Sequence, residues 1–245
     1  MKKSILALAA LTLLAGQAMA QEVKFATEAT YPPFEYMDSN NEFQGFDMDL
    51  ARAVCAEAKL TCSFHNQAFD SLIPSLKFRR FDAAIAAMDV TPERAKQVDF
   101  SDIYYENSAV FVVADGKFAK AEELAGKNVG VQNGTSHQTY LQEQLKDQGV
   151  VAVPYASYQN ALLDLTSGRV EAVFADTAVA AEWLKEHPGY QMLGKPVTDA
   201  KYFGAGFAIA VNKGNQALLD SLNKGLAAIK ANGTYQQIFD RYFAK

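Results

Sequence analysis

The segment Thr91-Pro92-Glu93-Arg94 has the residue types and the spacing of a carboxylate-binding site. Thr91 is a favourable N-cap, and Pro92 suits the first position of a helix. Arg94 then falls in the first helical turn, where its guanidinium can hold a carboxylate through two parallel hydrogen bonds. The alternative is an ordinary surface arginine that pairs with Glu93 or Asp99.

A second anion-binding pattern is Asn133-Gly134-Thr135-Ser136. Its glycine permits a close approach, its hydroxyls can donate hydrogen bonds, and the helix that follows presents free N–H groups. An ordinary helix cap made by threonine or serine explains the same residues. The pattern alone leaves both interpretations open.

Two aspartates follow segments that are similar to each other. Residues 80–85 read Arg-Phe-Asp-Ala-Ala-Ile and lead to Asp89, and residues 169–174 read Arg-Val-Glu-Ala-Val-Phe and lead to Asp176. Each carboxylate could pair with a ligand ammonium or cap the next helix. The repetition predicts two similar α/β lobes, although chance similarity between alanine- and valine-rich strands would also produce it.

A third carboxylate, Glu28, is close to aromatic residues. Tyr31 and Phe34 lie three and six positions after it, and Phe69 comes after the next strand-like segment. Aromatic faces bind a planar guanidinium through cation–π contacts, so this group could hold a cationic side chain. Packing in the core is the alternative for each phenylalanine.

Alternating strand-like and helix-like segments would position these residues. We expect strands at residues 23–27, 63–66, 81–87, 127–131, 151–154, 170–175 and 203–211. We expect helices at 47–59, with Asp47 as the N-cap, and at 70–79, 134–145, 157–165, 177–187, 215–230 and 235–242. This rhythm predicts mostly parallel sheets with helices on both faces.

The chain must cross twice between two such lobes if it starts and ends in the same one. The natural crossovers are residues 104–113 and 201–208. We therefore expect one lobe to contain residues 21–107 and 206–245, and the other to contain residues 108–205.

The strand ends and the turn at Arg94 define one candidate ligand site, because ligands of open α/β sheets bind beyond the carboxyl ends of the strands. Its expected members are Glu28, Tyr31, Phe69, Ala87, Met88, Asp89, Arg94, Gln132, Thr135, Ser136 and Asp176. One arginine against three carboxylates leaves this site net negative. An amino acid with a cationic side chain fits that charge balance better than glutamate does.

The N-terminus has the layout of a secretory signal peptide. Lys2 and Lys3 precede an apolar run over residues 5–16, and Ala18-Met19-Ala20 matches the small-x-small cleavage rule. The alternative is a membrane anchor, but the run is shorter than the roughly 20 residues of a spanning helix. We expect export and cleavage after Ala20.

Charge, cysteine content and missing motifs exclude several classes of function. The net charge is −5, and loss of Lys2 and Lys3 with the leader makes it −7, which disfavours nucleic-acid binding. Export favours a disulfide between Cys55 and Cys62 over two buried thiols. The histidines show no metal-ligand spacing, and the sequence has no nucleotide or nucleophile motif. We therefore expect no metal, no cofactor and no catalytic residue.

Several segments, in this order, resemble the amino-acid-binding branch of the periplasmic solute-binding proteins of ABC importers. They are Thr30-Tyr31-Pro32-Pro33-Phe34, Gly45-Phe46-Asp47-Met48-Asp49-Leu50, Phe69-Asp70-Ser71-Leu72-Ile73-Pro74-Ser75-Leu76, Thr91-Pro92-Glu93-Arg94, Gly168-Arg169 and Gly233-Thr234-Tyr235. Residues 26–34, 68–80, 132–135 and 174–177 are most similar to the arginine-binding subgroup. The resemblance covers essentially the whole mature chain. It implies a periplasmic protein with the type II binding-protein fold, an α/β fold with two lobes and two hinge crossovers.

The resemblance also implies roles for the ends of an amino-acid ligand. Arg94 would hold the α-carboxylate, helped by Ser136 and by the backbone near Thr135. Asp176 would bind the α-ammonium. His137 stands where those relatives carry glutamine, which leaves its contact with the ligand open.

For the ligand side chain, the resemblance implies that Glu28 meets the cation while Tyr31 and Phe69 stack on it. This chain departs from its relatives by carrying Ala87 and Asp89 in place of a serine pair, and Glu28 in place of a common aspartate. Asp89 would then share the ammonium or reach toward the guanidinium. The two cysteines match a disulfide of the related histidine and lysine/arginine/ornithine binders.

Three classes of function are compatible with these features. The first is a monomeric receptor that closes on arginine, or on another basic amino acid, and delivers it to the membrane subunits of an ABC importer. The second is a periplasmic dehydratase of the same fold with Glu28 or Asp89 as a general acid or base, although its anionic substrate would require more than one arginine. The third is a ligand-sensing partner of a membrane receptor. We expect the first.

Overall fold

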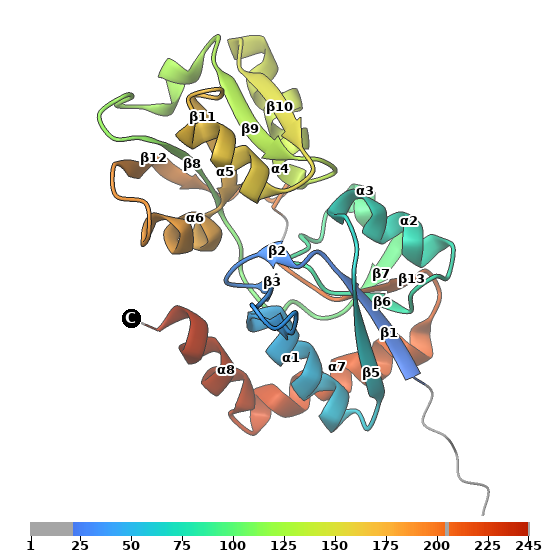
Figure 1. Ribbon diagram of the computed structural model, residues 1–245. Coiled ribbons are helices and arrows are strands. Elements are labelled where there is room, and N and C mark those ends of the chain that lie inside the picture. Colours follow the sequence, from blue (N-terminus) through green and yellow to red (C-terminus); the bar gives the residue numbers. More distant parts are fainter. Residues whose placement is uncertain (1–21, 204–205, 245) are drawn as a thin grey trace, which may run out of the picture.

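The computed structural model describes residues 22–203 and 206–244, which form two α/β lobes (Figure 1). The signal peptide and cleavage site expected at residues 1–20 lie outside the described residues. No helix among the described residues is both long and apolar enough to cross a membrane.

The first lobe is built on a five-stranded sheet. Its strands, in spatial order, are β5 (Thr61–Asn66), β1 (Glu22–Thr27), β6 (Ala83–Ala84), β13 (Ala210–Asn212) and β7 (Val98–Phe100). Strand β1 runs parallel to β5 and β6, whereas β13 runs antiparallel to both of its neighbours. The sequence predicts β6 over residues 81–87, but only two residues pair as a strand.

The second lobe repeats this arrangement. Its strands, in spatial order, are β10 (Val151–Tyr155), β9 (Asn128–Gln132), β11 (Ala172–Asp176), β8 (Ala109–Ala114) and β12 (Tyr190–Val197). The two similar segments of the sequence supply β6 and β11, which occupy the same central position in the two sheets. The prediction of two similar lobes is therefore confirmed.

One strand in each sheet corrects the expectation of a nearly parallel sheet. Strand β8 is antiparallel to β11, and β13 is antiparallel to β6. Both reversed strands come directly after the chain has crossed from the other lobe. A crossing chain enters the sheet from the edge that faces the other lobe, so it runs against the strands that began at the far edge.

Helices cover the sheets, and several differ from their expected bounds. In the first lobe they are α1 (Phe46–Glu57), the 3₁₀ turn η1 (Phe69–Ser71), α2 (Leu72–Lys77), α3 (Pro92–Ala95), α7 (Gln216–Ala231) and α8 (Thr234–Phe243). In the second they are η2 (Ala121–Leu124), α4 (Ser136–Tyr140), η3 (Leu141–Leu145), η4 (Lys146–Gln148), α5 (Tyr158–Thr166) and α6 (Thr177–Leu184). The helix expected over 134–145 is thus a short α-helix followed by a π-helical turn. A small sheet of β2 (Thr30–Tyr31), β3 (Glu35–Met37) and β4 (Phe43–Gln44) was not expected from the sequence.

Asp47 does not cap α1, contrary to the sequence prediction. The cap is Gly45, whose positive φ of 115° and close approach to Phe34 leave no room for a side chain. The buried Asp47 carboxylate instead accepts hydrogen bonds from the Ala87 N–H and from the Tyr104 hydroxyl, both at 2.8 Å. Asp47 thereby connects the segment after β6 to the first crossover.

The two crossovers lie side by side between the lobes. The Tyr104 N–H donates to the Phe207 carbonyl at 2.9 Å, and the Phe207 N–H donates to the Tyr105 carbonyl at 2.8 Å. The expected crossover at 104–113 is shorter than predicted, because β8 already begins at Ala109. The exact lobe boundaries, 21–107 with 206–245 and 108–205, stay a prediction.

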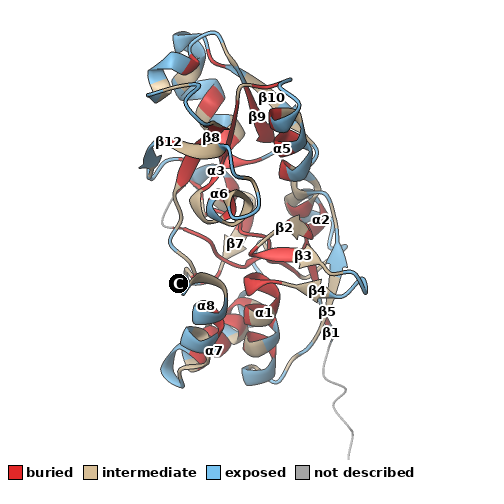
Figure 2. Cartoon of the chain, turned by 60° about the vertical axis from the view of Figure 1, so that its left-hand side comes forward, coloured by how far each residue is buried: buried red, intermediate tan, exposed pale blue. Residues whose placement is uncertain are grey.

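Burial follows the lobe structure, with buried residues concentrated on the strands and on the inner faces of the helices (Figure 2). Phe34 is fully buried against Phe46 and Phe207, so core packing is its role.

The predicted disulfide is present: Cys55 near the end of α1 is bonded to Cys62 of β5.

Candidate functional site

A cavity between the two lobes gathers most of the predicted site residues. Its first-lobe lining is Glu28, Tyr31, Phe69, Ala87, Asp89 and Arg94, and its second-lobe lining is Gln132, Thr135, Ser136, His137, Tyr158 and Asp176. Only Met88 of the predicted set lies elsewhere. Successive side chains in an extended segment point to opposite faces, so Met88 points into the core while its two neighbours face the cavity.

Arg94 is not the surface arginine that the sequence left as an alternative. Glu93 pairs with Lys96 at 2.7 Å, and Asp99 pairs with Lys213 at 2.7 Å. Arg94 is buried, with 8% of its surface exposed. Neither proposed surface partner therefore takes its charge.

The Arg94 guanidinium spans the gap between the lobes. Thr91 caps α3 by accepting a hydrogen bond from the Arg94 N–H, as predicted. One guanidinium nitrogen donates to the Asp89 carbonyl at 2.9 Å, and another donates to the Gly134 carbonyl of the second lobe at 3.1 Å. The Phe69 ring lies 5.3 Å from the guanidinium carbon. A guanidinium carries five N–H donors, so donors remain for a ligand.

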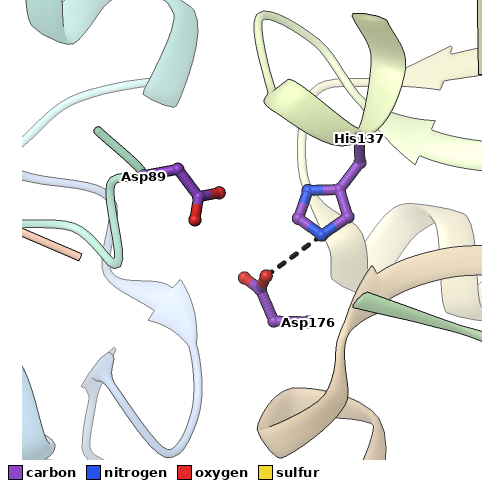
Figure 3. Close-up of side chains that lie close together, drawn as sticks. All are labelled: Asp89, His137 and Asp176. Atoms are coloured by element: carbon purple, nitrogen blue, oxygen red, sulfur yellow. Dashed lines mark ion pairs between the residues drawn. The ribbon is translucent and has the colours of Figure 1, made fainter. Parts of the chain in front are cut away.

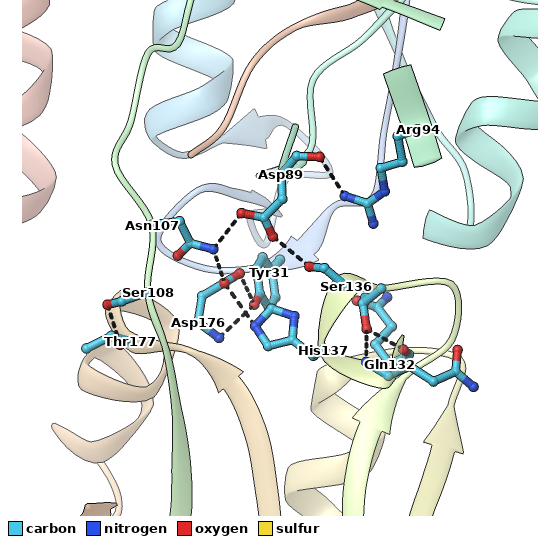
Figure 4. Close-up of polar contacts among 12 residues, drawn as sticks. Tyr31, Asp89, Arg94, Asn107, Ser108, Gln132, Ser136, His137, Asp176 and Thr177 are labelled. Atoms are coloured by element: carbon cyan, nitrogen blue, oxygen red, sulfur yellow. Dashed lines mark hydrogen bonds and ion pairs between the residues drawn. The ribbon is translucent and has the colours of Figure 1, made fainter. Parts of the chain in front are cut away.

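The carboxylates of Asp89 and Asp176 approach each other across the cavity (Figure 4). The Asn107 side-chain amide donates to Asp89 Oδ1 at 2.9 Å and to Asp176 Oδ1 at 2.6 Å. Ser136 donates to Asp89 Oδ2 at 2.7 Å, and the Tyr31 hydroxyl donates to Asp176 Oδ2 at 2.5 Å. One nitrogen donor therefore lies within hydrogen-bonding distance of both carboxylates.

Neither aspartate caps a helix with its side chain. Asp176 stands at the N-cap position of α6 but makes no side-chain capping bond, and Thr91 takes that role for α3. Burial raises the pKa of Asp89 to about 7, and the negative charge of Asp176 adds to this effect. The charges of His137 and Arg94 act in the opposite direction. The pair thus forms a buried acidic site in which a cation would favour the ionised form of Asp89.

Glu28 is a buried carboxyl group at another part of the cavity wall. Only 5% of its surface is exposed. Burial raises its pKa from 4.5 to about 7, against the effect of hydrogen bonds from Thr30 and Gln132. A cation placed beside Glu28 would favour the ionised form and lower this pKa again.

The second lobe contributes hydroxyl groups at the start of α4. Thr135 caps this helix by accepting the Gln138 N–H, so the ordinary cap interpretation holds for Thr135. Ser136 differs, because its hydroxyl faces Asp89 across the cavity. Gly134 has a positive φ of 73°, and a Cβ atom there would lie 2.9 Å from the Asp70 Cβ of the first lobe. The glycine thus permits a close approach of the lobes.

His137 and Tyr158 complete the lining of the cavity. The His137 ring is 2% exposed, and its Nε2 lies 3.0 Å from Asp176 Oδ1 without the alignment of a hydrogen bond (Figure 3). Tyr158, the first residue of α5, stacks its ring on Tyr31 at a centroid distance of 5.1 Å. This aromatic pair joins the two lobes.

The sequence reasoning missed Asn107 and Tyr158 and left His137 open. None of the three lies at the end of a strand. A polar asparagine beside the apolar segment that becomes β8 was the available signal for Asn107. Tyr158 had no signal of its own, since a tyrosine at the start of an amphipathic helix is ordinary.

Comparison with known proteins identifies the family. Residues 23–245 match the model of the bacterial extracellular solute-binding proteins, family 3, and the chain belongs to this family. It is 52% identical to the putative ABC transporter arginine-binding protein 2 and 51% identical to the ABC transporter arginine-binding protein 1, both of Escherichia coli K12. These alignments cover 100% and 99% of both chains, respectively. The solved structure of a Salmonella typhimurium periplasmic binding protein with high arginine specificity matches with a TM-score of 0.87 and 48% identity, over 91% of this chain and 100% of that one.

Proposed function

We propose that this family 3 solute-binding protein captures L-arginine, or another basic amino acid, between its lobes and delivers it to an ABC importer. The observation that carries the proposal is the charge balance of the cavity. One buried guanidinium, on Arg94, is set against the carboxyl groups of Glu28, Asp89 and Asp176. A zwitterion with an additional positive charge neutralises such a site. The names of the relatives support the same ligand.

The α-carboxylate of the ligand binds to Arg94 in this proposal. The guanidinium is already fixed by two backbone carbonyls and by α3, so little side-chain entropy is lost on binding. The backbone near Thr135 supplies further donors from the second lobe, and the Ser136 hydroxyl joins them when it turns from Asp89 to the ligand. A carboxylate held from both lobes would favour the closed arrangement.

The α-ammonium binds between Asp176 and Asp89. The Asn107 amide already lies within hydrogen-bonding distance of both carboxylates, and an ammonium can use the same acceptors. Asp89 therefore shares the ammonium with Asp176. It does not reach toward the ligand side chain.

The cationic side chain of the ligand meets Glu28, with Tyr31 and Phe69 offering aromatic faces. Burial of the Glu28 carboxylate without a partner is energetically unfavourable, so a cationic ligand group beside it would be strongly bound. The Thr30 hydroxyl donates a hydrogen bond to the Glu28 carboxylate and orients it.

The relatives are solute-binding proteins, and we propose binding without turnover for this chain as well. We further propose that it acts as a periplasmic monomer after cleavage of residues 1–20. A sensor for a membrane receptor would use the same closed lobes. Growth on arginine as the sole nitrogen source, compared before and after deletion of the gene, distinguishes transport from sensing.

Thermal unfolding of refolded protein tests the binding proposal. A ligand at a thousand times its dissociation constant stabilises the folded state by roughly 4 kcal/mol. We expect arginine to raise the unfolding temperature, and lysine, ornithine or histidine to raise it by less. No shift with any of the four would refute the proposal, and turnover of prephenate-like acids would favour an enzyme instead.

A further inference from the structure

His137 is a buried titratable side chain that the proposed amino-acid site does not use. It lies at the start of α4, and its aromatic neighbours include Phe174 and Phe203 at ring distances of 5.4 and 5.1 Å. Among the described residues, neither ring nitrogen has a hydrogen-bond partner. Buried polar atoms without a partner are rare in folded proteins and call for an explanation.

The Nε2 atom of His137 points toward the Asp176 carboxylate, and the Asp89 carboxylate faces another edge of the same ring (Figure 3). One potential ligand atom each from Asp89, His137 and Asp176 lies within 4.8 Å of the others, and all three residues are buried. His137 Nε2 lies 3.0 Å from Asp176 Oδ1. These residues are 48 and 39 positions apart in the sequence, so sequence spacing could not reveal the group.

We propose that Asp89, His137 and Asp176 also bind a divalent transition-metal ion, with Zn²⁺ as the best fit. Zinc takes imidazole and carboxylate ligands at about 2.0–2.2 Å, which places tetrahedral ligand atoms about 3.4 Å apart. A pair of ligand atoms at the 4.8 Å limit must therefore move closer by about 1.4 Å. The ligands come from both lobes, whose relative motion can supply that change.

The surroundings of the carboxylates suit a metal. Ser136 and Asn107 orient Asp89, and Tyr31 and Asn107 orient Asp176, which are the second-shell contacts that fix metal ligands. The other nitrogen of His137 has no such contact, so the site should bind about 10–100-fold more weakly than one with a complete second shell. The imidazole selects zinc over Mg²⁺, which prefers oxygen ligands and retains its waters.

The metal and the amino acid exclude each other. The ion uses the carboxylates to which we assign the α-ammonium, so this consequence rests on the proposed function, whereas the metal site itself does not. Zinc would then act as a competitive inhibitor of amino-acid capture.

Calorimetric titration of tag-free, ligand-free protein with zinc chloride tests the site. We expect one Zn²⁺ per chain and at least tenfold weaker binding by His137→Gln. The matched control is His65→Gln, which removes an exposed histidine that does not line the cavity and should bind zinc as the parent does. Circular dichroism and thermal unfolding establish that each variant is folded.

Three results would overturn the metal site: no zinc binding, equal zinc binding by His137→Gln, or equal binding of MgCl₂. If His137→Gln does not fold, Asp176→Asn replaces it and should show the same loss. Saturating arginine should abolish zinc binding. Zinc binding through His137 without any arginine binding would refute the proposed function alone, and arginine binding without zinc binding would refute the metal site alone.

Discussion

The two lobes have the same strand order but continue differently after their central strands. In the second lobe, Asp176 is the last residue of β11, and α6 begins immediately afterwards. In the first lobe, β6 ends at Ala84, and an irregular segment leads past Ala87 to Asp89. Ala87 has a positive φ of 43°, and its N–H is held by Asp47.

This difference determines which charges each lobe contributes. The longer segment of the first lobe brings both Asp89 and Arg94 to the cavity wall, whereas the second lobe contributes one carboxylate and neutral donors. Shared topology thus fixes where a site forms, and the irregular segment fixes what it binds. The first lobe should carry most of the binding free energy, and the second should mainly close the site.

The largest expected effect comes from the first lobe. Arg94→Ala should weaken binding of every amino acid by roughly 3–5 kcal/mol, because it leaves a desolvated ligand carboxylate without its partner. Calorimetry with arginine and with lysine measures this loss. Arg169→Ala is the matched control, since Arg169 is exposed and pairs with Asp164 outside the cavity. A loss below tenfold, or equal losses in the two variants, would contradict the role of Arg94.

The two equivalent aspartates should differ in their effects. We expect Asp176→Asn to weaken arginine binding by about 2–4 kcal/mol, because a buried charge loses its partner. Asp89→Asn should cost less, since burial raises the pKa of Asp89 to about 7 and it is therefore less fully ionised at neutral pH. Dissociation constants of the two variants, measured side by side, test this order. The reverse order would show that the first lobe binds the ammonium as well.

Glu28→Gln should weaken binding selectively. The loss for arginine should be about 1.5–3 kcal/mol if the bond is charge-assisted, with little change for the neutral analogue citrulline. Binding should also depend on pH, because the pKa of Glu28 is about 7 before a cation arrives. Below pH 7, Glu28 must lose its proton when arginine binds. The affinity for arginine should therefore fall by up to tenfold per pH unit for each carboxyl group that is deprotonated on binding.

The variant separates the contribution of Glu28 from that of Asp89, whose pKa is also about 7. Glu28→Gln should remove one proton from the pH slope of binding. The pKa of Glu28 is higher in the folded protein than in the unfolded chain, so its neutral form stabilises the folded state. This stabilisation is complete below pH 4.5 and is lost as the pH rises through about 7. Without ligand at pH 8, the variant should therefore unfold at a higher temperature. Equal losses for arginine and citrulline would refute the assignment.

The smallest expected effect concerns closure. Gly134→Ala adds a Cβ atom 2.9 Å from the Asp70 Cβ and places a side chain at a positive φ. We expect a loss of roughly 1–2 kcal/mol in stability from the backbone strain and an additional loss of affinity that reflects hindered closure. Gly168→Ala, also at a positive φ but with open space around it, controls for the strain. Equal affinity of the two variants for arginine would show that Gly134 has no role in closure.

Much of the site was predictable because strand ends converge at one edge of each sheet. Glu28, Gln132 and Asp176 follow from that rule alone. Met88 was misplaced because the rule does not track the alternation of side chains, and Asn107 and Tyr158 were missed because they come from a crossover and a helix. The buried Asp47 was misread as a cap, since its true partners lie 40 and 57 residues away.

The same limit applies to the fold. The two central strands were found from their repeated apolar pattern, which is a local signal. The short strands β2 to β4 pair only two or three residues each, and so they leave no periodic pattern. The reversed direction of β8 and β13 depends on how the chain crosses between lobes, which is information that no local window contains.

Calorimetric titration of refolded protein against arginine, lysine, ornithine, histidine and glutamine tests the central claim most directly. The net-negative cavity predicts one binding site per chain, with arginine bound most tightly and neutral glutamine bound at least tenfold more weakly. Glutamine bound as tightly as arginine, or no binding of any cationic amino acid, would contradict the account.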